Sequence, residues 1–152
     1  MNIVVASPAA LSNAIGASAT GDWFAIDQER IQAFADATED WQWIHLDAER
    51  AASGPFGATI AHGYLTLSLV PRLTDGLLSV GAVGMVVNYG LDKVRFLQPV
   101  TSGSRVRATV TLRAVETTAL GERAALTVTV EIEGSERPAL VAETLALFAP
   151  AP

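Results

Sequence analysis

The second half of the chain has a two-residue hydrophobic period, which predicts antiparallel β-strands with one face buried and the other in solvent. The expected strands cover about residues 85–96, 105–114, 126–133 and 139–148. The apolar parity of the first strand changes near Gly90, which indicates a bulge. Gly121 and Gly134 mark turns between the later strands. We therefore expect four long strands in a meander.

A helical region precedes these strands. Residues 61–73 are apolar on nearly every side of a helix, and such a helix should be surrounded by protein. Pro71 should remove one hydrogen bond and kink it, and Gly76 suits a C-terminal cap. Upstream, Asp27 and Asp47 are expected N-caps of shorter helices. One buried helix followed by a long antiparallel sheet predicts an α+β fold, with a curved sheet wrapped around the helix.

Composition and charge narrow the class of protein. The chain has 152 residues, 50% of them hydrophobic, which predicts a single domain over 1–152 with a weakly patterned segment at about 1–20. A net charge of −6 argues against nucleic-acid binding. The chain has no cysteine, which excludes a thiol nucleophile and fits a cytoplasmic location. The uncharged segment 51–71 contains several glycines and prolines, so no membrane span is expected.

The only two histidines, His45 and His62, focus the search for catalytic residues. Asp40 lies five residues before His45, so the two side chains converge only if the chain turns between them. A carboxylate and an imidazole directed at one point can hold and activate a water molecule. Spacing alone favours a simpler interpretation, in which Asp40 caps a helix and backbone groups satisfy His45.

Gly63 follows His62 at the start of the apolar helix. Free N–H groups and the positive end of the helix dipole gather there, and glycine lets a ligand approach the backbone. The N–H of Gly63 is therefore a candidate oxyanion hole for a thioester carbonyl. Taken alone, the segment is better explained by close packing at Gly63 and an ordinary core role for His62.

Together, Asp40, His45 and the segment Ile60–Gly63 (Ile-Ala-His-Gly) resemble the two motifs of the MaoC-like (R)-specific enoyl-CoA hydratases. The family motifs are Asp-x-Asn-Pro-x-His and, downstream, (Ile/Val)-His-Gly before an apolar helix. Residues 88–96 resemble the strand after that helix, and the likeness extends over about residues 23–148. More narrowly, the chain resembles a single-domain actinobacterial member of the family, close to the nodulation protein N-like subgroup. The resemblance implies the hotdog fold, an antiparallel sheet wrapped around a long central helix.

The resemblance also implies a reaction. Water would add to trans-2-enoyl-CoA to give (R)-3-hydroxyacyl-CoA, or leave in the reverse direction, and an acyl-carrier-protein thioester is the alternative substrate. Asp40 and His45 would activate one water while the N–H of Gly63 holds the thioester oxygen, with no metal and no cofactor beyond the substrate's coenzyme A. The sequence has Gln42 where the family has Asn, and Trp43 where it has Pro. These changes bear on substrate range and rate more than on reaction type.

Further residues are candidates for substrate contact. The predicted substrate-binding residues are Gln42, His62, Tyr64, Ser68, Asn88, Lys93 and Arg95. Lys93 and Arg95 share one strand face and suit pantetheine or phosphate contacts, although a solvated strand face explains them equally well. Tyr64 and Asn88 suit a pocket wall, and a core or turn role explains them slightly better. Ser68 stands on the helix where some relatives place a substrate-contacting serine.

The assembly and two competing functions complete the expectations. Exposed sheet edges favour a homodimer, and the resemblance implies that Lys93 or Arg95 serves the partner's site. A hotdog acyl-CoA thioesterase is one alternative, but such enzymes usually place a carboxylate on the central helix, and residues 60–73 contain none. The other is a non-catalytic acyl-thioester-binding subunit of a heteromeric dehydratase, which should lack the Asp40/His45 pair.

Overall fold

The computed structural model describes residues 1–152 and combines one long sheet with short helices. The helices are the 3-10 helix η1 (Pro8–Ala14), α1 (Gln28–Thr38), α2 (Trp43–Leu46), α3 (Ala48–Ala52), α4 (Gly63–Ser68) and α5 (Val70–Leu73). The strands are β1 (Ile3–Val5), β2 (Ser18–Thr20), β3 (Phe24–Ala25), β4 (Leu78–Val80), β5 (Val83–Phe96), β6 (Arg105–Thr118), β7 (Gly121–Ile132) and β8 (Leu140–Pro150). The predicted α+β class is confirmed.

The long strands form one sheet in the order β2-β6-β7-β8-β5, with β3 also paired to β6. The pairs β6–β7 and β7–β8 are antiparallel hairpins, as predicted. The expected four-strand meander is wrong for β5, which pairs with β8 instead of its sequence neighbour β6. A hydrophobic period identifies the buried face of a strand but not the strand beside it. The backbone of Leu97 shows the actual path, because its N–H donates to the Ala139 carbonyl just before β8 (2.8 Å).

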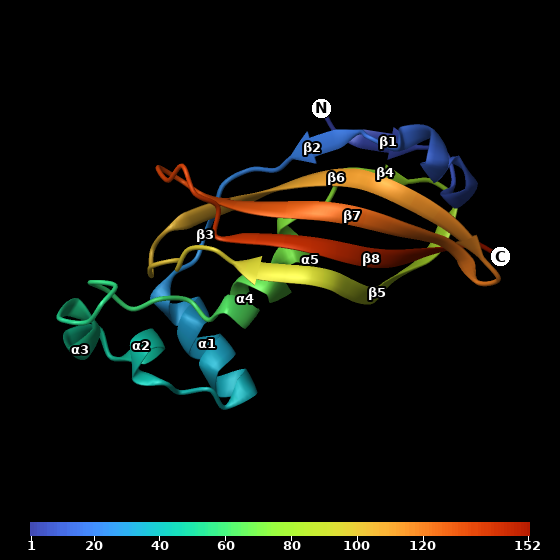
Figure 1. Cartoon of the computed structure of the whole chain (residues 1–152). Helices are drawn as coiled ribbons and strands as arrows, with labels where there is room; N and C mark the ends of the chain where they lie inside the picture. The colour runs from blue at the N-terminus through green and yellow to red at the C-terminus, as the bar shows by residue number, and fades with distance from the viewer.

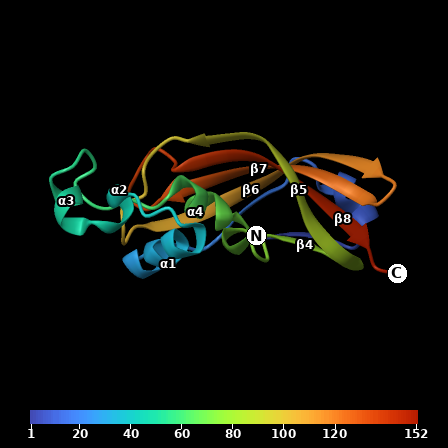
Figure 2. The ribbon, with the colours of Figure 1, turned by 90° about the horizontal axis from the view of Figure 1, so that it is seen from below.

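The core lies between one face of this sheet and the pair α4–α5 (Figures 1 and 2). Alternate residues of β6 and β7 supply the sheet side of this core, as the two-residue period predicted. The buried members of these two strands are Val106, Ala108, Val110, Leu112, Ala124, Leu126, Val128, Val130 and Ile132. Helices α1, α2 and α3 gather beyond one end of the strands (Figure 1). The fold thus separates a packed sheet-and-helix body from a helical end.

The central helix is shorter and less buried than the sequence predicted. It is interrupted at Leu69, between α4 and α5, and Pro71 cannot donate a helical hydrogen bond. The buried residues on one side are Leu65, Leu69 and Leu73, whereas Tyr64, Ser68 and Pro71 are exposed. Burial on every side is therefore wrong for the single chain, because nothing in the chain covers that second side.

Several local predictions are confirmed. Asp27 accepts a hydrogen bond from the Arg30 N–H (2.9 Å), and Asp47 caps α3 in the same way. The β5–β8 register shifts between Asn88 and Gly90, as a bulge there requires. The first 20 residues are more regular than their weak pattern suggested, since β1 pairs in parallel with β4. No helix in the structure is both long and apolar enough to cross a membrane.

Candidate active site

The turn between α1 and α2 carries the predicted pair of catalytic residues, Asp40 and His45. Helix α1 ends at Thr38, and the left-handed backbone of its C-cap residue Glu39 (φ 59°, ψ 28°) reverses the chain. Trp41 fixes the turn against α1, because its Nε1 donates to a carboxylate oxygen of Asp36 (2.8 Å). The chain therefore makes the turn that convergence of a five-residue spacing requires.

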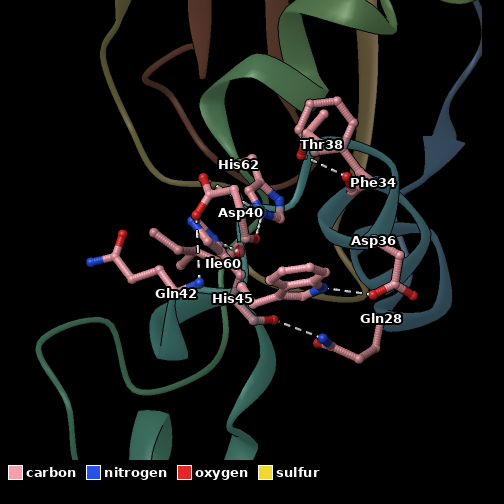
Figure 3. A network of polar contacts seen from close by, with 10 residues as sticks. Gln28, Phe34, Asp36, Thr38, Asp40, Gln42, His45, Ile60 and His62 are labelled. Atoms are coloured by element: carbon pink, nitrogen blue, oxygen red, sulfur yellow. Dashed lines mark hydrogen bonds and ion pairs between the residues drawn. The ribbon is translucent and has the colours of Figure 1, made fainter.

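Asp40, His45 and His62 meet where this turn approaches the start of α4 (Figure 3). One side-chain ligand atom from each residue lies within 4.8 Å of the others. The two imidazole rings stack, with centroids 3.7 Å apart and an interplanar angle of 22°. His62 Nε2 lies 3.0 Å from the Asp40 carbonyl oxygen and 4.0 Å from its carboxylate. His62 thus contacts both members of the predicted pair.

Backbone carbonyls determine which ring nitrogens carry protons. His45 Nδ1 lies 2.7 Å from the Ile60 carbonyl oxygen, and because a carbonyl only accepts, Nδ1 carries the proton. Nε2 of His45 then has the lone pair, and it makes no hydrogen bond within the chain. The same reasoning places the His62 proton on Nε2, which donates to the Asp40 carbonyl. Nδ1 of His62 is buried without a partner, so only His45 offers an accessible basic nitrogen.

The environment of His45 favours its neutral form. The residue is buried, whereas the Asp40 side chain is exposed. Burial lowers the pKa of His45 below its ordinary value of 6.5; the hydrogen bond to Ile60 opposes this, neighbouring His62 adds to it, and the Asp40 charge opposes it. A neutral imidazole with a free Nε2, beside a carboxylate, is equipped to act as a general base.

Asp40, His45 and His62 are also the residues that could bind a metal ion together, because each offers one ligand atom. The two rings are stacked, however; His62 Nε2 is already bonded to the Asp40 carbonyl, and His62 Nδ1 is buried. A divalent ion needs converging ligands. The arrangement is better suited to a water molecule held between Asp40 and His45.

Known proteins resemble this chain in sequence. Residues 11–134 match the family described as MaoC like domain. The chain belongs to the MaoC-like dehydratase family. Its sequence is 55% identical over 128 residues to 3-hydroxyacyl-thioester dehydratase Z of Mycobacterium tuberculosis, covering 84% of this chain and 85% of that protein. It is 45% identical over 146 residues to nodulation protein N of Rhizobium leguminosarum bv. viciae, covering 93% of this chain and 88% of that protein.

A solved structure gives the same result at the level of fold. The structure of this chain matches that of the (R)-hydratase from A. caviae involved in PHA biosynthesis, with a TM-score of 0.69 and 25% sequence identity. The match covers 88% of this chain and 96% of that one. The fold is the hotdog fold that the sequence motifs implied, and the predicted membership of the MaoC-like family is confirmed.

Gly63 occupies the first position of α4 in the MaoC-like domain, directly after His62. The first turn of a helix supplies no acceptor for its own N–H groups, so this N–H is available to a ligand. A cavity of about 320 Å³ lies beside it, with Phe56, Ile60 and Phe96 among its largely apolar lining. The position suits the predicted oxyanion contact, which stays a prediction.

A larger cavity of about 830 Å³ lies between α4–α5 and the sheet. Two of the predicted substrate-binding residues, Ser68 and Asn88, line it from the helix side and from β5. Most of its other lining residues are apolar, including Leu126 and Phe148. The cavity therefore has the character of a site for an apolar chain with a few polar contacts.

The remaining predicted residues lie apart from both cavities. Gln42 is exposed, and its amide points away from the polar network (Figure 3). Tyr64 is 71% exposed. Lys93 and Arg95 are exposed on β5 and share one strand face, as predicted, since no register shift separates them. A single MaoC-like chain thus brings together Asp40, the two histidines and Gly63, but not these four residues.

Sequence reasoning missed two residues that hold the site together, Gln28 and Thr59. Gln28 Nε2 donates to the His45 carbonyl (2.7 Å), and the Thr59 hydroxyl donates to Gln28 Oε1 (2.6 Å). The pattern gave no signal for either, because Gln28 reads as a solvent-facing residue of the first helical turn. Thr59 stands 31 residues away, in an irregular segment. Only the tertiary structure brings them together.

Proposed function

We propose that this protein hydrates trans-2-enoyl thioesters to (R)-3-hydroxyacyl thioesters, and catalyses the reverse dehydration. The observation that carries the proposal is the 2.7 Å contact of His45 Nδ1 with the Ile60 carbonyl, which leaves Nε2 as the basic nitrogen of a ring that lies beside Asp40. The name of the tuberculosis relative supports a 3-hydroxyacyl thioester as substrate. The (R)-hydratase of matching fold supports the stereochemistry.

The proposed chemistry uses one water molecule. Asp40 and His45 orient it, and His45 Nε2 takes a proton as the water oxygen bonds to the β-carbon. The electron pair of the double bond moves towards the thioester carbonyl, and the N–H of Gly63 donates to the oxygen that becomes negative. His45 then returns the proton to the α-carbon, while the Asp40 carboxylate stabilises the imidazolium in the meantime. The protein ends in its starting protonation state, and the substrate's coenzyme A is the only cofactor involved.

The proposed active unit is a homodimer. Strand β5 is a 14-residue edge strand that pairs only with β8. It exposes a row of apolar side chains, namely Met85, Val86, Val87, Tyr89, Leu91 and Phe96. A long apolar edge of this kind favours pairing with another chain. A second copy on β5 would cover the larger cavity, and it would carry Lys93 or Arg95 towards the phosphates of the thioester in the opposite site.

The test is turnover of crotonyl-CoA and of longer trans-2-enoyl-CoAs, followed by loss of the enoyl absorbance while free thiol is monitored. We expect the enoyl band to disappear without thiol release. Asp40→Asn and His45→Gln should each lower kcat by at least about 100-fold, the scale of general acid–base catalysis. Glu49→Gln makes the same carboxylate-to-amide change at an exposed position of α3 and should leave the rate unchanged.

Two other results would point to other functions. Release of thiol from acyl-CoA would identify a thioesterase. Binding of acyl thioesters without turnover, on coenzyme A or on acyl carrier protein, would identify a non-catalytic subunit of a heteromeric dehydratase. Turnover that survives in both Asp40→Asn and His45→Gln would leave a hydratase with a different catalytic group.

A further inference from the structure

The backbone of His45 is held by a chain of polar groups from two other segments. The amide of Gln28, on the first turn of α1, uses both of its ends: Nε2 donates to the His45 carbonyl and Oε1 accepts from Thr59 (Figure 3 shows the first contact). Thr59 is only 4% exposed, so its hydroxyl has little access to water. The His45 carbonyl only accepts, so it takes the NH₂ end of the amide, and the Thr59 hydroxyl donates to the Oε1 end and holds it in place.

A second set of bonds joins the same segments. The Ile60 N–H donates to the Ile44 carbonyl (3.0 Å), and the Ile60 carbonyl accepts from His45 Nδ1 (2.7 Å). Gln28 is bonded to the backbone of His45, and Ile60 is bonded to its ring. The position of His45 relative to Ile60 thus depends on both sets of hydrogen bonds. A rotation of α2 that lengthened the Gln28 bond would also disturb the Nδ1–H bond that fixes the tautomer.

Helix α2 cannot supply this rigidity by itself. It has four residues, and its N-cap residue makes no side-chain capping bond. A single helical turn is unstable in isolation, because few hydrogen bonds offset the entropy of ordering it. The external contacts of Gln28 and Ile60 therefore decide where the imidazole lies.

We propose that Gln28, anchored by its hydrogen bond from Thr59, is a positioning residue that holds His45 so that Nδ1 meets the Ile60 carbonyl and Nε2 is free for the reacting water. This inference rests on the proposed hydration for its kinetic consequences, while its structural part concerns His45 alone. Gln28 makes no contact with Asp40 in this network, so its effect is transmitted through the backbone of His45.

The kinetic test compares Gln28→Met, which keeps the length of the side chain without its hydrogen bonds, with Glu29→Met. Glu29 is the next residue of the same first turn of α1, is exposed, and makes no side-chain hydrogen bond, so it is a control for the change to Met on this turn. We expect Gln28→Met to lower kcat by about 10- to 100-fold with little change in KM, as a displaced catalytic group does. Thr59→Val should lower kcat in the same direction, and Thr59→Ser, which keeps the hydroxyl, should recover it.

A spectroscopic readout tests the same inference without turnover. The untagged chain has two histidines, so ¹⁵N imidazole spectra contain two ring systems, which His45→Gln assigns. In the unmodified protein, His45 should show a protonated Nδ1 and an unprotonated Nε2. In Gln28→Met, its signals should move towards a mixture of tautomers, while the His62 signals and the unfolding transition change little.

The outcomes separate this inference from the proposed function. If the unmodified protein hydrates no enoyl thioester, the proposed function fails, and the tautomer of His45 in Gln28→Met alone decides whether Gln28 positions it. Unchanged kcat together with an unchanged tautomer would overturn the positioning role. So would a loss of kcat that Glu29→Met matches, or one that only follows a loss of folded protein.

Discussion

Replacing Gly63 with alanine tests the proposed oxyanion contact by adding one methyl group. A Cβ at this position would lie 3.1 Å from Cδ1 and Cε1 of the Phe96 ring, closer than ordinary van der Waals contact. The backbone of Gly63 is in the normal helical region, so alanine causes no backbone strain there. The methyl group would enter the cavity that Gly63 and Phe96 line, next to the N–H that is proposed to hold the thioester oxygen.

The effects on stability and on rate should differ in size. The added Cβ would meet ring atoms of Phe96 and no backbone atom, so a shift of the ring by a few tenths of an ångström relieves the contact. Alanine also has the better helix propensity, by up to about 1 kcal/mol. We therefore expect the free energy of unfolding to change by no more than about 1 kcal/mol. The methyl group should keep the thioester oxygen from the N–H, and loss of one oxyanion donor lowers kcat by about 100- to 1000-fold.

The assay pairs urea unfolding, at one fixed protein concentration, with enoyl-CoA hydration. Gly63→Ala should be folded and slow. Adding Phe96→Leu makes room for the methyl group and should restore any lost stability without restoring the rate. Hydration at the unmodified rate in Gly63→Ala would refute the reasoning, because it would show that the oxygen is bound elsewhere. A strongly destabilised Gly63→Ala that Phe96→Leu does not rescue would refute the packing argument.

Two further predictions concern pH and assembly. Burial lowers the pKa of His45 below 6.5, so the unfolded chain binds a proton more readily than the folded chain does. The contribution of His45 to the free energy of unfolding should therefore be present above about pH 6.5. It should be lost as the pH falls through the lowered pKa of the folded protein. Urea titrations between about pH 5 and pH 8 should show this decline, and it should be smaller in His45→Gln; an equal decline in both proteins would contradict the assignment. Val86→Lys and Leu91→Lys place charges on the exposed apolar row of β5 and should shift a dimer towards monomer in light scattering, with activity falling in parallel; an active dimer in both variants would place the interface elsewhere.

The sequence predicted those parts of the fold that local chemistry decides. Asp27 and Asp47 cap helices because a short carboxylate can reach the N–H groups of the next turn, whatever surrounds it. The bulge near Gly90 follows from apolar parity alone. Pairing of β5 with β8 could not be predicted in this way, because the same alternation suits any neighbour. The exposed side of α4 was missed for a related reason, since apolar residues on a helix do not tell which chain covers them.

In the candidate site, too, some residues could be predicted from the sequence and others could not. Asp40 and His45 could be found because both residue types carry recognisable chemistry and their spacing matches a family motif. Gln28 and Thr59 could not, because each is an ordinary polar residue until its partner is known, and their hydrogen bond spans 31 positions. The stacking of His62 on His45 is likewise a product of tertiary structure. Sequence therefore identified the candidate reacting groups, and the structure was needed to identify what holds them.

The two departures from the family motif, Gln42 and Trp43, explain why contacts from other segments are needed to position His45 in this chain. The motif has Asn and Pro at positions 42 and 43, and these residue types favour helix starts, Asn as N-cap and Pro in the first turn. Here Gln42 makes no capping bond and Trp43 begins α2. The guanidinium of Arg50 lies 4.0 Å over the Trp43 ring, and Gln28 binds the carbonyl of His45 from α1. Contacts with neighbouring segments thus take the place of local start signals, so the position of the imidazole is set from outside its own helix.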